Sequence, residues 1–507
     1  MALDFSRNVH YLWALLPEVV LCTWGMVVLL AGVWRRAGDP AQEATDGSRS
    51  GDLGWLAVVG VGLAAVANGW LYGVREVGTV GMIAVDGFRL FSNWIFLITA
   101  ALGILISFAY VHRQRLQAGE YYGLILLSTA GMMFMAGARD LIVVFLGLEV
   151  MSIAVYALSA FNRRDRRSAE AGLKYFLLGA FSTGFFLYGI ALVYGAAGST
   201  HLTLIAQAVS SGSAQGALLL SGIALLGVGF AFKVSVVPFH MWTPDVYEGA
   251  PAPVTAFMSA GVKAAAFAAF FRVFLVSFQG AYESWYGVMW WLAALTMIAA
   301  NLIALVQTNV KRMLAYSSVA HGGYLMVGIT AANETAASAA LFYLLVYAVM
   351  NLGAFAVVIA VANHGEERLE LEDYSGLGRT QPLLALFLTL FLLSLAGFPG
   401  TGGFMAKFQL LLSAVDARLW VLSVILVLTT VVSYAYYLRL AWYAWMREPS
   451  EGVGVGQVDV PISMRLALAT SAAVVLWLGV FPGATLDFAR ASVVGLAALG
   501  GVAGAGP

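Results

Sequence analysis

The sequence predicts an all-α, polytopic membrane protein with about 14 transmembrane helices. Of its 507 residues, 61% are hydrophobic and only 11% are charged, whereas a soluble protein has roughly 45–50% apolar and about 25% charged residues. Apolar stretches of about 20 residues recur along the chain, and each is long enough to cross a hydrocarbon core of roughly 30 Å. Charged or Pro- and Gly-rich segments separate them. Together these observations exclude a soluble globular domain.

The spans can be placed in order along the chain. Their approximate limits are 11–34, 53–73, 89–111, 121–138, 140–161, 168–197, 215–246, 251–278, 285–307, 311–331, 335–363, 381–414, 418–446 and 463–481. The first is not a signal peptide, because Asp4 and Arg7 precede a long apolar run and no small-x-small cleavage site follows it. It is therefore expected to remain as a span.

Two of the spans are expected to be interrupted helices. Spans 7 (215–246) and 12 (381–414) are unusually long and contain Pro238 and Pro399, respectively. Proline lacks an amide hydrogen and breaks the helical hydrogen-bond pattern. In span 12, Pro399 is followed directly by Gly400, in a glycine-rich run. Irregular backbone inside a membrane is tolerated only where protein or a water-filled cavity surrounds it.

The charge balance limits the possible partners and cofactors. Lys plus Arg equals Asp plus Glu at 27 each, which gives no reason to expect a nucleic-acid partner. A single cysteine, Cys22, excludes an internal disulfide, a cysteine-ligated iron–sulfur cluster and a cysteine-type zinc site. No HExxH, GxGxxG or phosphate-binding loop is present. We expect no metal site and no cofactor in this chain.

Basic residues predict the orientation. They are concentrated in the loops after odd-numbered spans, with a cluster at 163–167 and a pair at Lys311 and Arg312. Cytoplasmic loops carry such an excess of Lys and Arg. We therefore expect the odd-numbered loops in the cytoplasm and both termini on the outer side.

Apart from the basic residues in loops or at helix ends, five lie within predicted spans: Lys174, Lys233, Lys263, Lys407 and Arg439. A lysine at the centre of a bilayer costs about 2.5–3.5 kcal/mol, so these side chains must face protein or water. Lys174 and Arg439 lie toward span ends, where a long side chain often reaches the interface. The other three lysines are the stronger candidates for function.

Several ionisable residues share one depth. Glu149 lies about nine residues into span 5, or roughly 14 Å, and Lys263 and His321 are also at mid-depth in spans 8 and 10. Lys233 is near the middle of span 7, beside the break at Pro238, whereas Lys407 follows the break of span 12 toward the outer side. Such groups fit a proton path, although a structural salt bridge, and for His321 a packing role, remain alternatives.

The two breaks also suggest an internal repeat. They fall five spans apart, and an odd separation forces the two segments into inverted topology. The tripeptide at 179–181 recurs at 353–355. Spans 4–8 and 9–13 are therefore predicted to form two inverted five-helix repeats. The expected regions are 1–120 (spans 1–3), 121–278 (first repeat, inner half-channel), 285–446 (second repeat, outer half-channel) and 447–507 (loop, span 14 and tail).

Three segments carry a resemblance to a known family. The run 229–253, from Gly-Phe-Ala-Phe-Lys233 through Pro238 to Tyr247-Glu-Gly-Ala-Pro251, closely resembles the broken helix 7 of subunit N of bacterial respiratory complex I, the proton-translocating NADH:quinone oxidoreductase. Residues 311–318 and 170–175 are similar to that subunit as well. The Tyr247 to Pro251 run favours subunit N over its antiporter-like sisters L and M.

The resemblance implies roles for particular residues. It implies that Glu149 and Lys233 form a charged pair linked to a proton channel, that Lys263 is a central relay and that Lys407 is an outward site. His321 and Lys174 are possible relay residues. Flavin, iron–sulfur clusters and quinone are implied in partner subunits and not in this chain.

The same resemblance implies the cellular setting. It implies a multi-pass protein of the bacterial inner membrane, with subunits K and M and the lateral helix of L as neighbours, lipids around it and an indirect link to a peripheral NADH-oxidising arm. The expected function is proton translocation coupled to quinone reduction elsewhere in the complex. The alternatives are a subunit of a multisubunit cation/proton antiporter, a subunit of a ferredoxin-dependent relative, and a purely structural membrane scaffold.

Overall fold

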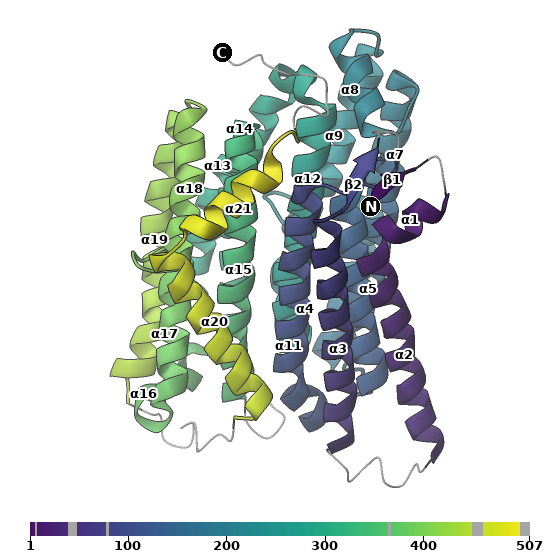
Figure 1. Cartoon of the computed structure of the whole chain (residues 1–507). Coiled ribbons are helices and arrows are strands. Elements are labelled where there is room, and N and C mark those ends of the chain that lie inside the picture. The colour runs from purple at the N-terminus through teal and green to yellow at the C-terminus, as the bar shows by residue number, and fades with distance from the viewer. Residues whose placement is uncertain (6–7, 39–47, 78–80, 363–366, 449–459, 497–507) are drawn as a thin grey trace.

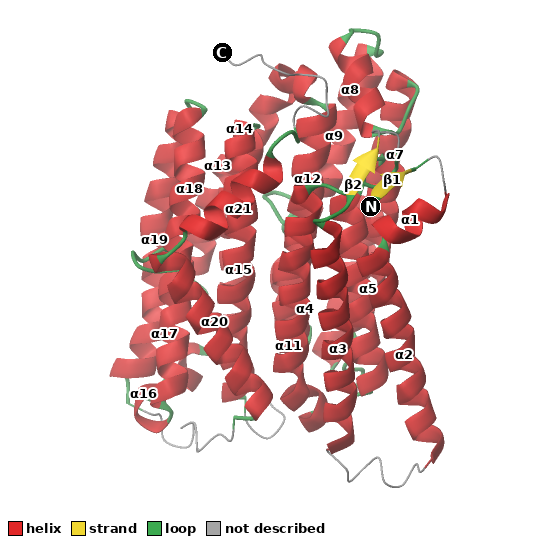
Figure 2. Cartoon of the chain, in the orientation of Figure 1, coloured by secondary structure: helices red, strands yellow, loops and turns green. Residues whose placement is uncertain are grey.

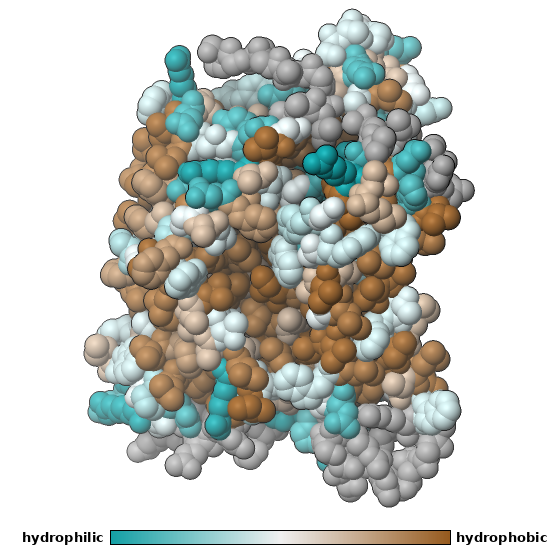
Figure 3. All heavy atoms as spheres, viewed as in Figure 1, coloured by the Kyte–Doolittle hydropathy of each residue, from teal (hydrophilic) through white to brown (hydrophobic). Residues whose placement is uncertain are grey.

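Long helices that run side by side form the body of the protein in the computed structural model (Figure 1). The structure describes residues 1–5, 8–38, 48–77, 81–362, 367–448 and 460–496. Helix dominates, and the described strands are one short parallel pair, β1 with β2 (Figure 2). The all-α prediction is confirmed, and the face seen in Figure 3 shows a broad apolar band between two more hydrophilic ends.

The elements follow the predicted spans closely. The N-terminal region contains β1 (Ala2–Asp4), α1 (Asn8–Ala14), α2 (Leu16–Gly38), α3 (Ser48–Leu71), β2 (Arg75–Val77) and α4 (Gly87–Arg113). The first predicted repeat contains α5 (Ala118–Gly137), α6 (Leu141–Ser159), α7 (Arg166–Ala197), α8 (Leu202–Ser210), α9 (Gly216–Lys233), α10 (Trp242–Gly249), α11 (Ala252–Phe257), a π-helical turn (Met258–Val262) and α12 (Lys263–Ser277).

The described part of the second half of the chain is also helical. It contains a 3-10 turn (Gln279–Ala281), α13 (Tyr282–Leu305), α14 (Val310–Ala331), α15 (Glu334–Val361), a 3-10 turn (Leu371–Tyr374), α16 (Leu377–Thr380), α17 (Pro382–Ala396), α18 (Gly402–Asp416), α19 (Trp420–Met446), α20 (Ile462–Val480) and α21 (Gly483–Val493). Among the described residues, eleven helices are long and apolar enough to cross a membrane, and the fourteen predicted spans all fall on helical segments.

Side-chain caps set where several long helices begin. Asp86, Asp140 and Asp165 precede α4, α6 and α7, and each accepts a hydrogen bond from a backbone amide of the first turn. Asn309 and Asn333 do the same for α14 and α15. The first amides of a helix have no partner within the helix, so these caps stabilise the chosen starting points.

Two central helices are buried along almost their whole length. The side chains of the α11–α12 segment are buried throughout, and almost all those of α15 are buried as well. A helix that is apolar on every face is stable only inside protein or lipid. Lys263 at the start of α12 therefore lies in the protein interior, as its cost in lipid requires.

Both predicted helix breaks are present. In span 7, α9 ends at Lys233, and an irregular segment that contains Pro238 and has Ser235 at φ 63° precedes α10. Lys233 is thus the last residue of its helix, not a mid-helix residue. In span 12 the break lies where it was predicted, between α17 and α18, with Gly397 and Gly400 at φ 90° and 87°. Glycine adopts this left-handed conformation without steric cost.

The basic residues near helix ends also differ from expectation. Arg89 and Arg272, placed in loops or at helix ends by the sequence, are buried and form ion pairs with Glu18 and Asp86, respectively. Lys311 is buried too and pairs with Glu367. A buried charge is tolerated when it is paired. The contacts responsible join residues far apart in the chain, which a loop assignment from one sequence does not reveal.

Candidate buried proton path

Lys263 lies at the centre of a buried polar cluster. Its side chain is 2% exposed, and its Nζ donates to the Oγ of Ser318 at 2.5 Å and to the carbonyl oxygen of the same residue on α14. The ring of Tyr347 on α15 faces the ammonium, with its centroid 5.6 Å from Nζ. The π-helical turn directly before Lys263 belongs to the same segment. Such turns are frequent at functional sites.

Lys407, beside the second helix break, is buried next to a tyrosine ring, as Lys263 is. It is 5% exposed, and its Nζ donates to the carbonyl oxygen of Ala396 at 3.0 Å. Ala396 is the last residue of α17, so the lysine binds a carbonyl that the break leaves without a helical partner. The ring of Tyr324 lies 4.8 Å from Nζ, at a distance where a cation and an aromatic face attract each other.

His321 connects these two lysine sites. Its ring lies 4.9 Å from that of Tyr347, which faces Lys263, and 5.6 Å from that of Tyr324, which faces Lys407. The histidine is 1% exposed. The structure therefore brings together three of the predicted site residues, through two tyrosines that sequence analysis did not single out.

Both ring nitrogens of His321 have hydroxyl partners. Nδ1 lies 2.6 Å from the Tyr343 hydroxyl and Nε2 lies 3.3 Å from that of Tyr437. The Tyr437 hydroxyl also hydrogen-bonds to Ser317. A neutral imidazole donates at one nitrogen and accepts at the other, and a hydroxyl can do both. The histidine is thus held inside a hydrogen-bond network that can relay a proton.

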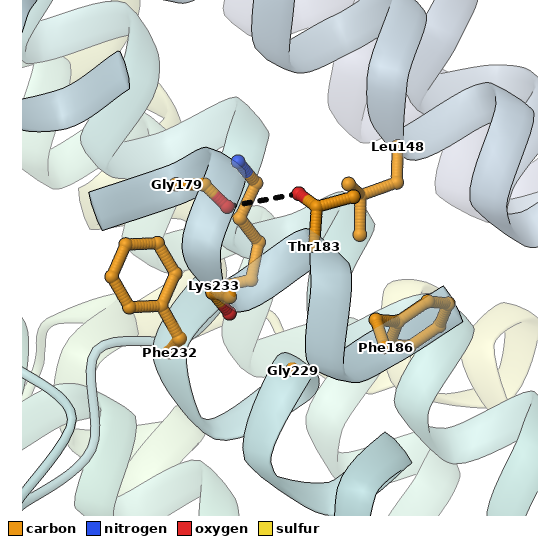
Figure 4. A pocket seen from close by; sticks show the side chains of 8 residues that line it. Leu148, Gly179, Thr183, Phe186, Gly229, Phe232 and Lys233 are labelled. Atoms are coloured by element: carbon orange, nitrogen blue, oxygen red, sulfur yellow. Dashed lines mark hydrogen bonds between the residues drawn. The ribbon is translucent and has the colours of Figure 1, made fainter. Parts of the chain in front are cut away.

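Lys233 forms a separate site in the first predicted repeat. It is 4% exposed, and its Nζ donates to the Tyr156 hydroxyl at 3.5 Å. The rings of Tyr156 and Tyr175 face the ammonium at 5.2 and 5.3 Å. A small cavity of about 10 Å³ lies beside the lysine, between Gly179 and Thr183 of α7 and the end of α9 (Figure 4). That space is close to the minimum for one water molecule.

Glu149 lies on α6, two helical turns before Tyr156, and is partly buried. Among the described residues it forms no ion pair with Lys233 within 4.0 Å, and its Oε1 is buried without a hydrogen-bond partner. The pair implied by the family resemblance is therefore not in direct contact here. The lysine instead hydrogen-bonds to the Tyr156 hydroxyl.

Lys174 is not part of the buried cluster. Its side chain is 41% exposed and pairs with Glu170 at 2.7 Å and with Asp245 at 2.9 Å. Lys174 precedes Tyr175, so it contacts the Lys233 site only through its neighbour in sequence. Arg439 donates to the carbonyl groups of Leu305 and Gln307.

The two break segments pack tightly on other helices. The amide of Val237, which precedes Pro238 in a cis peptide, donates to the Thr296 hydroxyl of α13 at 2.9 Å. Beside Pro399, the carbonyl oxygen of Gly400 lies so close to Gly479 of α20 that a Cβ atom there would come within 2.3 Å. Neither irregular segment is therefore a loose loop.

The buried tyrosines and serines are the residues that sequence analysis missed. They had no distinguishing signal, because aromatic side chains in apolar spans usually pack against lipid or protein. The depth of each lysine was a usable signal, since a tyrosine at the same depth on another span is a candidate partner. Among the described residues, no group of three or more His, Cys, Asp or Glu side chains is arranged to hold a metal ion.

Comparison with known proteins identifies the family. Residues 138–433 match the family described as NADH:quinone oxidoreductase/Mrp antiporter, TM. A relative from Trichlorobacter lovleyi, named NADH-quinone oxidoreductase subunit N, is 47% identical, and the alignment covers 94% of this chain and 96% of the relative. The chain belongs to the NADH-quinone oxidoreductase subunit N family. Another member, from Solibacter usitatus, is 42% identical over 95% of this chain and 97% of its own length.

Solved structures share the fold of this subunit N family member. A chain of respiratory complex I from Thermus thermophilus, solved with bound aureothin, is 34% identical with a TM-score of 0.78, over 94% of this chain and all of that one. A chain of the Mrp complex from Dietzia is 23% identical with a TM-score of 0.79, over 95% and 97% of the two chains. At that identity the likeness to the Mrp chain concerns the fold alone.

Proposed function

We propose that this chain is an antiporter-like subunit of a proton-translocating NADH:quinone oxidoreductase and that it moves protons across the membrane while quinone is reduced elsewhere in the complex. The main support for the proposal is that Lys263, His321 and Lys407 are nearly fully buried and that their side chains contact shared tyrosine rings. A purely structural role would not require three titratable groups in one apolar interior.

The path has an inner and an outer part. Lys233 receives protons in the first half-channel, residues 121–278, and Lys263 and His321 pass them through the centre of the molecule. Lys407, after the break between α17 and α18, releases them in the second half-channel, residues 285–446. Helix axes stand about 8–10 Å apart, so water must complete the steps between hydrogen-bonded side chains.

Charge movement near the lysines supplies the driving force. In a poorly solvated interior, the balance between an ammonium and a neutral amine depends strongly on nearby charges. Glu149 is the acidic residue that acts on Lys233 in this proposal, without direct contact between the two. A shift of either side chain changes how readily the lysine holds its proton.

The assembly and the setting follow from the proposed function. The neighbours are subunits K and M and the lateral helix of subunit L, and a peripheral arm oxidises NADH. Flavin, iron–sulfur clusters and quinone belong to those partner subunits. The protein lies in the bacterial inner membrane, and the excess of basic residues in its odd-numbered loops supports an outer position for both termini.

A cation/proton antiporter of the Mrp type is the main rival, because it shares the fold. Relatives at 42–47% identity over almost the whole chain carry the name of subunit N, which favours the oxidoreductase. A complex with a ferredoxin donor is a second rival. Purification in mild detergent followed by mass spectrometry separates them, because flavin and iron–sulfur subunits should co-purify only with an electron-transferring complex.

Replacement of Lys233 with Met tests the transport role. Methionine keeps a long unbranched side chain and removes the titrating group. We expect the complex to assemble but to pump protons much more slowly in vesicles, as measured by a pH-sensitive dye during NADH oxidation. Glu448→Gln, at an exposed ion pair with Arg379, is the control. An assembled Lys233→Met complex with normal pumping would contradict the proposal and favour a structural role.

A further inference from the structure

Asp245 joins three helices at the charged surface of the first helix break. It lies on α10, and its Oδ2 accepts a hydrogen bond from Lys174 of α7 at 2.9 Å. Its Oδ1 accepts another from Arg312 of α14 at 3.0 Å. The Asp245 carboxylate thus connects α10, the short helix after the break, with α7 of the first predicted repeat and with α14 of the second.

The contacts extend in both directions as an alternating series of charges. Lys174 also pairs with Glu170 at 2.7 Å, and Arg312 also pairs with Glu248 at 2.7 Å. We call Glu170, Lys174, Asp245, Arg312 and Glu248 the Asp245 bridge. Its side chains are 25–63% exposed. Half-exposed ion pairs contribute little to stability, so a positional role explains the arrangement better than a structural one.

The bridge is adjacent to the aromatic residues that cover Lys233. Trp242 lies one turn before Asp245 on α10, and its ring stacks on Tyr175 with centroids 4.3 Å apart and an interplanar angle of 8°. Its Nε1 donates to the carbonyl oxygen of Phe232, directly before Lys233, at 3.1 Å. Tyr175 follows Lys174 in sequence. Trp242 is therefore connected to the bridge through Asp245 on the same helix, and Tyr175 is connected to it through Lys174.

Two spaces are associated with this stacked pair. An open pocket is lined by four residues of the bridge, Glu170, Lys174, Asp245 and Glu248. The small cavity beside Lys233 is the second space (Figure 4). The ring of Tyr175 faces the same lysine. The Tyr175 hydroxyl is buried and has no hydrogen-bond partner. A buried hydroxyl without a partner is costly, and water that enters between the aromatic rings would supply one.

We propose that Asp245 is a positioning residue that controls access from the open pocket to Lys233. While the bridge is closed, α10 holds Trp242 against Tyr175 and keeps water from the lysine. When the bridge opens, α10 is released and the stacked pair separates. This inference rests on the proposed function, because it assigns an uptake route to the proton site at Lys233.

The hydrogen bond from Arg312 to Asp245 also connects access to Lys233 with the position of α14. Arg312 is on the same helix as Ser318, which accepts the hydrogen bonds of Lys263, and as His321. If a change in the protonation of Lys263 shifts α14, the shift would displace Asp245 through its hydrogen bond with Arg312. Packed helices transmit small displacements because they have discrete arrangements. Access to Lys233 would then depend on the state of the second repeat.

The test uses Asp245→Asn in the whole complex, reconstituted into vesicles. Asparagine keeps the size of the side chain and removes the charge that holds both cations. We expect a rise in passive proton leak when no NADH is present and a fall in protons pumped per electron pair. Asp245→Glu should restore both values. Glu448→Gln, which removes an exposed pair with Arg379, is the matched control and should change neither.

Variants of the two cations that contact Asp245 test the same bridge. Lys174→Met and Arg312→Met should each raise the leak, and neither should add to it in combination with Asp245→Asn, because all three open the same bridge. If Asp245→Asn does not assemble, the two single cation variants carry the same test. An assembled Asp245→Asn complex with normal leak and normal pumping ratio would overturn the inference. The Lys233→Met complex distinguishes this failure from failure of the proposed function, since only the latter predicts normal pumping there.

Discussion

Lys407 donates a hydrogen bond of 3.0 Å to the carbonyl oxygen of Ala396, the residue at which α17 ends. The last carbonyl groups of a helix have no helical partner, and in a membrane interior an unpaired carbonyl is costly. The ammonium satisfies this carbonyl, and the carbonyl in turn compensates a charge that would be unstable in an apolar interior. The helix break and the lysine therefore stabilise each other.

This relationship gives a prediction for Lys407. The proposed release step requires the side chain to lose its proton in each cycle, whereas a guanidinium retains its proton at physiological pH. Lys407→Arg should therefore reduce pumping nearly as strongly as Lys407→Ala, measured in vesicles during NADH oxidation. If the Arg variant pumped normally, the position would require only a fixed positive charge and the release role would be wrong.

Glu149 should act through its charge. Because its Oε1 has no hydrogen-bond partner and Lys233 is not in contact, the exact reach of the side chain is less important than its ionisation. Glu149→Gln should impair NADH-driven pumping strongly, and Glu149→Asp should retain much of it. The comparison is made on purified complexes with equal subunit content. Equal activity of the two variants would indicate that the carboxylate is a packing element only.

Gly403 should be essential for the second break. A Cβ atom at this position would lie 1.8 Å from the carbonyl oxygen of Ser394, so Gly403→Ala must displace α17 from α18. Overpacking of this kind costs about 1–3 kcal/mol. We expect a lower melting temperature of the complex and reduced pumping. Gly184→Ala is the control, because its Cβ would meet no atom within 4 Å, and an equal loss in both variants would contradict the explanation.

The pair of Asp86 with the buried Arg272 predicts acid sensitivity. Burial alone would raise the pKa of Asp86, but the charge and hydrogen bonds of Arg272 outweigh burial and lower it. Both carboxylate oxygens accept hydrogen bonds of 2.7 Å from the guanidinium. Removal of one partner of a buried pair costs about 3–5 kcal/mol, so Asp86→Asn should lower the melting temperature at neutral pH.

The sign of the pH effect follows from the lowered pKa of Asp86. The pair contributes its full stability above the unfolded pKa of about 3.9 and loses it as pH falls through the lower folded value. The stability difference between the unchanged protein and Asp86→Asn should therefore stay constant down to about pH 4 and shrink only below it. A difference that disappears near pH 6 would mean that another group is responsible.

The sequence alone determined the spans, the two helix breaks and the lysines of the proposed path. These features follow from strong local constraints. About 20 apolar residues must cross a membrane as a helix, proline and glycine cannot continue one freely, and a lysine in such a span must face protein or water. The break between α17 and α18 lay where Pro399 and Gly400 predicted it, since glycine carries the left-handed backbone there.

The tertiary structure decided what those lysines contact. Ser318 meets Lys263 across 55 residues of sequence, and Asp245 meets Lys174 across 71. It also decided that Glu149 and Lys233 remain apart, with Tyr156 beside the lysine instead. Such partners depend on how each helix is rotated against its neighbours, and many side chains can pack an apolar interior equally well. A single sequence therefore specifies that a buried charge needs a partner, but only the packed helices specify which residue it is.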